Sequence, residues 1–400
     1  MSTFTELGVS APVAGALARR GITEPFKIQN LVLGDALAGR DILAKSKTGS
    51  GKTLGFAIPI VERTDAQMVR PAALVLVPTR ELAVQVAEEM FDIASARSLR
   101  VATVYGGVGL DAQAKRARKA HIIVATPGRL QDLVDRKLIS LDRITILVLD
   151  EADRMLDMGF QPQVDRIVQR ISNKRQTMFF SATLDGRVGQ LARSYTNEPA
   201  HFEVAEDRPT IELASHRFLP VTAENKIDNL VKLLREQRDL ALVFVRTKHG
   251  ADKLVKKLKA QGIHSLAIHG NKTQSQRQRA LDSFSDGRVD VLVATDVAAR
   301  GLDVDDISHV INFDPPHDHT DYVHRVGRTA RAGRNGAGIT FVDADKRNDV
   351  SAMARKLKLT TEFEADGLRM TAPAGRPGQS RGRNSGNRSS GNRRRTRSYR

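Results

Sequence analysis

The chain has 400 residues, a formal net charge of +17 at pH 7 and no cysteine. The length suits two ordinary domains rather than one, and the lack of cysteine excludes disulfides, cysteine-ligated zinc and thiol chemistry. The strongest apolar run, Ile144 to Leu149, has the length of a buried strand and cannot cross a membrane. The amino terminus lacks the charged start and apolar run of a secretory signal. We therefore expect a cytoplasmic protein without membrane association.

Strand-like apolar runs alternate with segments of helical spacing twice along the chain, after a mostly helical pattern over Phe4 to Arg40. Helical spacing marks segments such as Arg80–Ala96, Lys248–Ala260 and Gln274–Phe284. This alternation predicts an α/β fold with parallel sheets covered on both faces. In the first half, the expected strands are Asp41–Ala44, Ala72–Val77, Val101–Val104, His121–Ala125, Ile144–Leu149 and Thr177–Phe180. In the second half, they are Leu240–Val245, His264–Ile268, Val289–Ala294, His309–Asn312 and Ile339–Val342.

Two polar segments interrupt this pattern. Glu203–Leu213 is the expected linker between two lobes. From Gly367 to Arg400 there are ten arginines, no lysine and no acidic residue, so this tail carries +10 of the net charge. Since it is almost empty of large apolar side chains, we expect it to be disordered. We interpret it as an arm that binds polyanions without reading sequence, with a solubilising appendage as the alternative.

The first motif is Ser46-Lys-Thr-Gly-Ser-Gly-Lys-Thr53, between an expected strand and an expected helix. Gly49 and Gly51 let backbone N–H groups approach phosphate oxygens at a helix N-terminus. Lys52 can reach the β- and γ-phosphates, and the Thr53 hydroxyl is placed for Mg²⁺. The pattern therefore predicts a phosphate-binding loop, although Ser46 stands where such loops usually begin with glycine.

The second motif, Asp150-Glu-Ala-Asp153, ends the most apolar strand of the first half. The carboxyl ends of parallel strands carry the ligand sites of such sheets, so these carboxylates should face the phosphate-binding loop. Asp150 suits indirect Mg²⁺ coordination, and Glu151 suits polarising a water molecule. Alone, the motif would fit a solvated helix start.

A third motif, His324-Arg-Val-Gly-Arg-Thr-Ala-Arg-Ala-Gly333, supplies Arg325, Arg328 and Arg331 at three-residue spacing. Phosphoryl transfer needs positive charge near the γ-phosphate, which arginine fingers provide. The spacing alone also fits a solvated basic helix face. Gln29 has the donor and acceptor needed to read an adenine edge, which favours ATP over GTP.

Together with Ser181-Ala-Thr183, these motifs stand in the order found in DEAD-box ATP-dependent RNA helicases of superfamily 2, which the chain resembles from about Phe4 to about Val342. The resemblance implies two tandem RecA-like parallel-sheet domains plus a disordered arginine-rich tail. The expected boundaries are residues 1–205 for the first domain, 206–214 for the linker, 215–362 for the second domain and 363–400 for the tail.

The resemblance also implies site residues. ATP would contact Phe4, Gln29, Thr48, Gly49, Ser50, Gly51, Lys52, Thr53 and Asp303. Asp153, Ser181, Thr183, Arg300, His324 and Arg325 would couple the lobes, with Arg328 and Arg331 as arginine fingers. RNA would contact Arg80, Gly107, Thr126, Arg129, Thr247, Gln274, Arg277 and Thr295. The chain departs from the family pattern at Ile22, where an aromatic residue is usual, at Phe26-Lys27, which replaces Thr-Pro, and at Ala330, which replaces glycine.

The expected function is local, non-processive RNA duplex unwinding or ribonucleoprotein remodelling, with ATP and Mg²⁺ as cofactors and RNA-stimulated ATP hydrolysis. RNA would be recognised through its backbone, independently of sequence, by a monomer whose tail could meet ribonucleoprotein or RNA-decay partners. The alternatives are a DNA-directed helicase, an ATP-dependent RNA clamp or strand annealer, and a generic P-loop ATPase. The sequence does not name the physiological RNA, the pathway or a protein partner.

Overall fold

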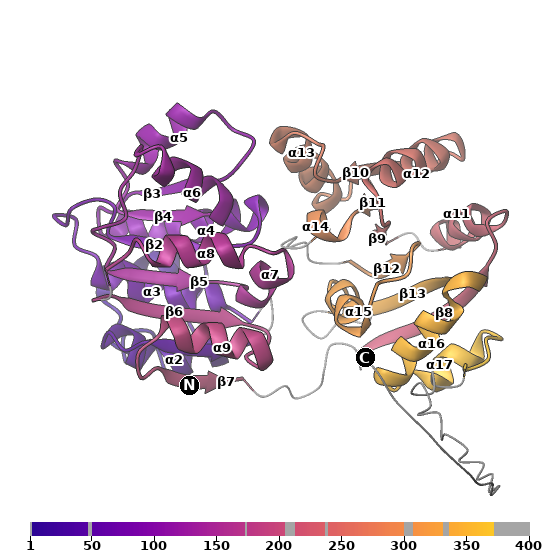
Figure 1. Ribbon diagram of the computed structural model, residues 1–400, viewed down its shortest axis with the longest axis horizontal. Coiled ribbons are helices and arrows are strands. Elements are labelled where there is room, and N and C mark those ends of the chain that lie inside the picture. Colours follow the sequence, from indigo (N-terminus) through magenta and orange to yellow (C-terminus); the bar gives the residue numbers. More distant parts are fainter. Residues whose placement is uncertain are drawn as a thin grey trace, which may run out of the picture.

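The computed structural model describes residues 2–46, 50–172, 174–204, 213–236, 239–299, 307–330 and 336–371, which form two lobes (Figure 1). Each lobe is built around one parallel sheet. Among the described residues, no helix is long and apolar enough to cross a membrane.

The first lobe has a seven-stranded sheet in the order β3-β4-β2-β5-β6-β1-β7. Its strands are β1 (Ile42–Lys45), β2 (Ala73–Leu76), β3 (Val101–Val104), β4 (Ile122–Ala125), β5 (Ile146–Leu149), β6 (Gln176–Ser181) and β7 (Ala200–Glu203). Its helices are α1 (Ala11–Arg19), α2 (Lys27–Leu37), α3 (Lys52–Arg63), α4 (Arg80–Ala96), α5 (Leu110–Ala117), α6 (Pro127–Asp135), α7 (Ala152–Asp157), α8 (Gln161–Val168) and α9 (Gly186–Tyr195).

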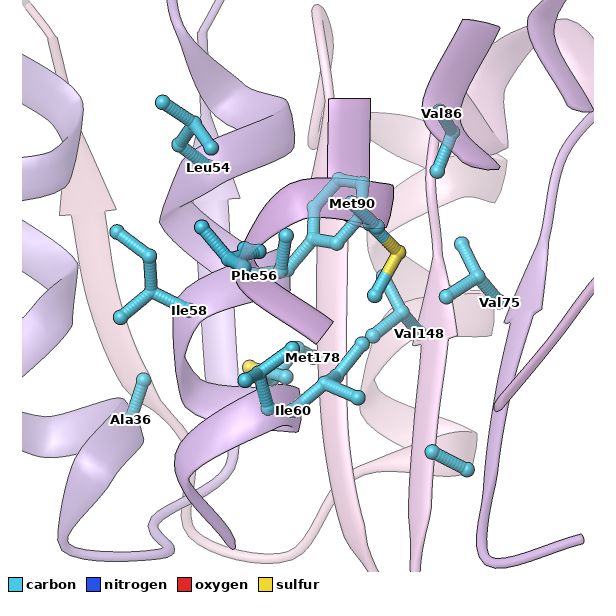
Figure 2. Close-up of a cluster of buried hydrophobic side chains, with 14 of the residues drawn as sticks. Ala36, Leu54, Phe56, Ile58, Ile60, Val75, Val86, Met90, Val148 and Met178 are labelled. Carbon is cyan, nitrogen blue, oxygen red and sulfur yellow. The ribbon is translucent and has the colours of Figure 1, made fainter. Parts of the chain in front are cut away.

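Helices cover both faces of this sheet, as the alternating pattern predicted. Along β2, Val75 belongs to the core under α1 to α4, and Leu74 and Leu76 belong to the core under α5 to α9. Successive strand side chains point to opposite faces, so a continuous apolar strand fills both cores. Figure 2 shows the first of these cores, where Phe56 of α3 and Met90 of α4 lie over the sheet.

The second lobe has a six-stranded sheet in the order β10-β11-β9-β12-β13-β8. Its strands are β8 (Ala214–Val221), β9 (Ala241–Phe244), β10 (Ser265–Ile268), β11 (Val291–Ala294), β12 (His309–Asn312) and β13 (Gly336–Asp343). Its helices are α11 (Lys226–Glu236), α12 (Lys248–Ala260), α13 (Gln274–Ser285), α14 (Asp296–Ala299), α15 (His319–Val326), the short 3₁₀ helix Ala344–Lys346, α16 (Arg347–Lys356) and α17 (Thr360–Ala365).

The expected strands are confirmed, but two edge strands were missed. β7 and β8 flank the expected linker. Their sequences, AHFE and ASHRFLPV, mix exposed and buried positions and contain polar residues, so they did not give the apolar pattern of a strand. β8 also begins at Ala214, which we had placed in the linker. Residues 205–212 lie outside the described residues.

The expected start of the tail at Phe363 was wrong. Phe363 is fully buried, and its ring lies 5.4 Å from that of Phe218 on β8. The Thr371 N–H donates to Ser351 Oγ of α16 at 2.9 Å. Because Phe363 and Leu368 both belong to the core of the second lobe, the folded chain extends to Thr371. Residues 372–400 lie outside the described residues.

Candidate nucleotide and nucleic-acid site

The sheet order of the first lobe brings three motifs to one edge. β5, β6 and β1 are neighbours, so the motifs that follow them emerge side by side at their carboxyl ends. The Ser46 N–H donates to the Ser181 carbonyl at 2.9 Å, and the Asp150 N–H donates to the Leu76 carbonyl at 3.0 Å. The predicted phosphate-binding loop and the DEAD motif therefore share one end of the sheet, as expected, and the SAT motif lies there as well.

The described residues of the predicted phosphate-binding loop lie between the end of β1 and the start of α3. Lys52 begins α3, is only 6% exposed, and donates from Nζ to the Ser46 carbonyl at 2.9 Å. Its ammonium is thereby turned back toward the loop rather than to solvent. Gly51 adopts a φ of 82°, in the left-handed region that favours glycine, and it precedes Thr53 on the first turn of α3. Thr48 and Gly49 lie outside the described residues.

Gln29 connects α2 to this loop. It is fully buried, its Oε1 accepts from the Phe26 N–H at 3.0 Å, and its Nε2 donates to the Gly51 carbonyl at 2.8 Å. A carboxamide has two N–H groups and two lone pairs, so these two bonds use one donor and one acceptor of the amide. Phe4, expected to contact the nucleotide as well, is 3% exposed and packs within the core of the lobe.

All three carboxylates of the DEAD motif are buried, and the pKa values of two of them, Asp150 and Glu151, are shifted in opposite directions. Burial raises the pKa of Asp150 to about 7, against the favourable charge of Lys52. Burial also acts to raise the pKa of Glu151, but Arg154, Lys52 and Arg328 outweigh it and hold that pKa below its ordinary value. Arg154 Nη1 lies 2.8 Å from Glu151 Oε2, and both side chains are 5% exposed. Glu151 is therefore ionised and fixed in orientation. Its φ of 51° is left-handed, a strained conformation that clusters at functional sites.

The SAT motif is tied to the DEAD motif inside the first lobe. Ser181 is fully buried, and its Oγ accepts from the Asp153 and Thr183 N–H groups, each at 3.3 Å. The Thr183 side chain is exposed. A shift of either motif would therefore be transmitted to the other.

The second lobe contributes charge to the same place. Both His324 and Arg328 help to lower the pKa of Glu151, so the last motif faces the DEAD motif across the two lobes. Arg328 is 4% exposed. Arg331, Arg300 and Asp303 lie outside the described residues.

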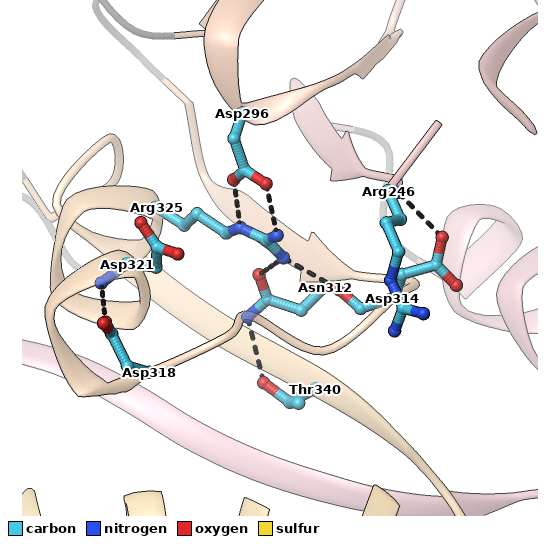
Figure 3. Close-up of polar contacts among 8 residues, drawn as sticks. All are labelled: Arg246, Asp296, Asn312, Asp314, Asp318, Asp321, Arg325 and Thr340. Carbon is cyan, nitrogen blue, oxygen red and sulfur yellow. Dashed lines mark hydrogen bonds and ion pairs between the residues drawn. The ribbon is translucent and has the colours of Figure 1, made fainter. Parts of the chain in front are cut away.

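Arg325, an expected coupling residue, places its guanidinium among residues of the second lobe (Figure 3). Its Nε and Nη2 bind both oxygens of Asp296 at 2.5 and 2.8 Å. Its Nη1 donates to Asn312 Oδ1 at 3.0 Å and to the Asp314 carbonyl at 2.8 Å. A bidentate pair of this kind holds both partners in a fixed geometry. Arg325 thus fixes the loops of the second lobe around α15.

Arg277, an expected RNA contact, makes an ion pair between the lobes. Its Nη2 lies 2.7 Å from Oε2 of Glu81, at the start of α4, and the two side chains are 8% and 5% exposed. Beside it, neither polar atom of the buried Gln274 amide has a hydrogen-bond partner within the described residues. The pair joins the PTREL segment of the first lobe to α13 of the second.

Other expected RNA residues shape loops. The Arg80 guanidinium lies against Gly106 and Gly107, where an added Cβ would overlap it. Arg129 donates from Nη1 to the Val108 carbonyl at 2.9 Å and to Gln113 Oε1 at 3.0 Å. Thr247 accepts from the Gly250 N–H at 2.9 Å and thereby caps α12. Thr126 precedes α6, Thr295 precedes α14, and both are largely buried.

Comparison with known proteins decides the family. The family model described as DEAD/DEAH box helicase matches residues 26–191, and the helicase conserved C-terminal domain matches residues 225–333. The chain is 40% identical to the DEAD-box ATP-dependent RNA helicase CshA of Geobacillus kaustophilus over 90% of its own length and 78% of the relative. This chain belongs to the DEAD-box helicase family. CshA of Bacillus subtilis is 38% identical over 92% of this DEAD-box chain and 74% of the relative.

Solved structures add information on how the lobes of this DEAD-box protein are arranged. Saccharomyces cerevisiae Dbp5 bound to RNA and ADP BeF3 superposes with a TM-score of 0.81 at 31% identity, covering 90% of this chain and 94% of Dbp5. Mss116p bound to ssRNA and AMP-PNP gives 0.78 at 27% identity, covering 88% of this chain and 77% of Mss116p. A DEAD box protein from Methanococcus jannaschii, 34% identical and covering 89% and 97%, gives only 0.51. The lobes are therefore arranged as in the RNA- and nucleotide-bound relatives.

Sequence reasoning missed two residues of this site. Glu81 was part of the Pro78-Thr-Arg-Glu-Leu82 segment, but nothing local shows that its partner lies nearly two hundred residues away. Arg154 follows the DEAD motif directly, and its three-residue spacing from Glu151 on a helix start was a usable signal.

Proposed function

We propose that the protein is an ATP-dependent RNA helicase that couples RNA-stimulated ATP hydrolysis to local, non-processive duplex unwinding or ribonucleoprotein remodelling. The observation that carries this proposal is the double connection between the lobes, through Arg277 with Glu81 and through the charge of Arg328 on Glu151. The first joins segments expected to touch RNA, and the second joins segments expected to touch ATP. Ligands that each favour the closed arrangement raise affinity for one another.

The residues present fit ATP with Mg²⁺. We assign the adenine edge to Gln29, the phosphates to the loop that ends at Lys52 and Thr53, and the ion to the Thr53 hydroxyl and, through water, to Asp150. A buried carboxylate whose pKa is raised to about 7 is a group that a nearby cation would stabilise in its charged form. Bound Mg²⁺ would neutralise charge on the phosphate oxygens. The remaining expected ATP residues, Phe4, Thr48, Gly49, Ser50, Gly51 and Asp303, stay part of this proposal.

Hydrolysis would then use groups of this chain as follows. Lys52 holds the phosphate chain near the DEAD motif. Glu151, kept ionised and oriented by Arg154, accepts a hydrogen bond from the attacking water and takes up its proton. Arg328 and Arg331, brought by the second lobe, stabilise negative charge on the transferring phosphoryl group. Asp153, Ser181, Thr183, Arg300 and His324 would pass the state of the nucleotide site to the lobe arrangement.

RNA would lie across both lobes, held by its sugar-phosphate backbone. We assign phosphate contacts to Arg80 and backbone approach to the loops containing Gly107, Thr126, Thr247, Gln274 and Thr295, with Arg129 and Arg277 acting through the protein contacts described above. Recognition of this kind is independent of base sequence, and the 2′-hydroxyl would distinguish RNA from DNA.

The wider assignments are also proposals. Residues 1–205 would form the ATP-binding domain, and residues 214–371 the second helicase domain. The arginine-rich segment that follows would contribute salt-dependent, sequence-independent RNA affinity and a contact for ribonucleoprotein or RNA-decay partners. We propose a cytoplasmic monomer, because both lobes of the site belong to one chain.

The test is steady-state ATP hydrolysis with no nucleic acid, with single-stranded RNA and with DNA of equal length, followed by strand separation of a short RNA duplex. Stimulation by RNA alone, lost in Glu151→Gln, together with ATP-dependent strand separation, is the expected result. Equal stimulation by DNA would favour a DNA-directed enzyme. ATP-dependent RNA binding without strand separation would indicate a clamp or annealer, and hydrolysis indifferent to both nucleic acids would refute the helicase assignment.

A further inference from the structure

The first lobe has an open groove of about 670 Å³ along β3, the edge strand of its sheet. Its floor is formed by Val101, Ala102 and Thr103 of β3, and one wall is formed by α4. Side chains of successive strand residues point to opposite faces of a sheet. Because the groove contacts three consecutive residues of β3, it runs along the edge of the strand rather than over one face. It is separate from the candidate nucleotide site, since four strands lie between β3 and β1 in the sheet order.

The outer edge of β3 offers backbone hydrogen-bonding groups. The carbonyls of Arg100 and Val104 accept from the N–H groups of Ile122 and Thr126, at 3.1 and 2.9 Å, on the β4 side. Alternate residues of a strand turn their backbone groups to the same neighbour. Val101 and Thr103 therefore turn theirs away from β4, where the described chain places no further strand. An edge of this kind accepts an added strand.

The wall from α4 is apolar and unusually exposed. Phe91 is 63% exposed, although it is a large aromatic side chain on a helix that otherwise buries its apolar face. Val84 and Ala87, seven and four residues before it on α4, line the groove with it. Apolar side chains of an added strand would cover this wall, since every second one points to the same side.

The charges at the rim select the occupant. Arg100, Arg116 and Lys119 line the groove, all exposed and none of them in an ion pair with another described residue, against a single acid, Glu88. A second copy of this chain, paired edge to edge, would bring like charges together. An acidic chain would be attracted instead.

We propose that the β3 edge is a docking site for an extended, acidic peptide segment of a partner protein, which adds as a strand to β3 and places apolar side chains over Phe91. Backbone hydrogen bonds would supply affinity, and the apolar wall and cationic rim would supply selectivity. The proposal does not depend on ATP hydrolysis, because no residue of the groove belongs to the catalytic motifs.

The test measures fluorescence anisotropy of a labelled synthetic peptide of alternating glutamate and valine with the full-length protein. Three comparison peptides are used: one with lysine in place of glutamate, one with serine in place of valine, and one N-methylated at alternate backbone amides. We expect binding of the first peptide only. Phe91→Ser, and separately the double variant Arg100→Glu with Lys119→Glu, should weaken it by roughly tenfold or more. The matched control is Leu31→Ser, an exposed apolar residue (44%) on α2, which contacts β1 and β7 toward the opposite edge of the sheet.

Three outcomes would overturn the proposal. Equal binding of the N-methylated peptide would exclude strand addition, and equal binding of the lysine peptide would exclude charge selection. Displacement of the peptide by single-stranded RNA, with the same dependence on Phe91 and Arg100, would mean that the groove extends the RNA path from the adjacent Gly106–Gly107 loop. Unchanged thermal unfolding of the variants confirms that any loss of binding is local.

Discussion

Breaking the Glu81–Arg277 ion pair should weaken the closed arrangement of the two lobes while leaving each lobe folded. Arg277→Gln leaves the Glu81 carboxylate without its partner, in a place where only 5% of that side chain is exposed. Removing one member of a buried pair costs about 3–5 kcal/mol when the other charge stays buried. Here the lobes can separate and let water reach Glu81, so the cost falls on the closed arrangement rather than on folding.

The magnitude follows from that difference. We expect Arg277→Gln to destabilise the closed arrangement by about 2–3 kcal/mol, less than the cost of a charge that stays fully buried. At about 1.4 kcal/mol per tenfold, this lowers the equilibrium constant for closure by roughly 30- to 150-fold. Glu81→Gln should give a loss of similar size. The double variant should recover much of it, because two neutral amides leave no charge buried.

The assay is binding of a non-hydrolysable ATP analogue in saturating single-stranded RNA, with energy transfer between dyes on the two lobes. Since the chain has no cysteine, dyes can be attached at Lys137→Cys and Lys256→Cys, both at exposed positions. The control is Arg136→Gln, which removes an ion pair with Asp132. The side chains of Arg136 and Asp132 are 61% and 39% exposed, so loss of this pair should have little effect on closure. Less than a twofold change in the single variants, or losses that simply add in the double variant, would refute a coupling role for the pair.

Three further results are expected. Glu151→Gln should lower kcat for ATP hydrolysis by about 10²–10⁴-fold while fluorescent ATP analogues still bind; loss of binding instead would assign Glu151 to ground-state affinity. Asp150→Asn should melt above the wild type at pH 8 without nucleotide or magnesium, and the difference should shrink toward pH 4. In the wild type, burial raises the pKa of Asp150 from 3.8 to about 7. Between these two pH values the folded state binds more protons than the unfolded state, so the stability of the wild type falls as pH rises. A difference in melting temperature that stays constant from pH 4 to pH 8 would contradict this reasoning. Phe363→Ala should destabilise the second lobe by about 3–5 kcal/mol in urea unfolding, whereas deletion of residues 372–400 should leave its stability unchanged. An equal loss of stability in both variants would place the boundary of the fold elsewhere.

The sequence predicted most of the first and second sheets because their central strands are buried on both faces. β2 and β5 read as ALVL and ILVL, and such runs are typical of strands buried inside a parallel sheet. β7 and β8 lie at sheet edges, where one side of the strand is not covered, and their polar residues are indistinguishable from those of a linker. The tail boundary failed for a related reason, since one buried Phe363 in a short polar helix carries little periodic signal.

Within the site, motif spacing predicted which residues gather but not which atoms they use. Lys52, Asp150 and Ser181 meet because strand order fixes them, and strand order follows from rules of connection that the sequence obeys. Arginines are different, because a guanidinium with five donors can satisfy several partners at the end of a long side chain. Arg325 and Arg277 were assigned from the family pattern to lobe coupling and to RNA, and each found a carboxylate that no local pattern connects with it.

That difference bears on how the lobes respond to ligand. Arg325 makes four hydrogen bonds within the second lobe, so it moves with α15 and its neighbouring loops as one body. Arg277 and Glu81 meet only when the lobes are closed. RNA bound beside this pair, as we propose, would add contacts to an interface that already pairs opposite charges. We expect the closure that places Arg328 near Glu151 to be a rigid-body step, with a free energy set by the few residues that cross between the lobes.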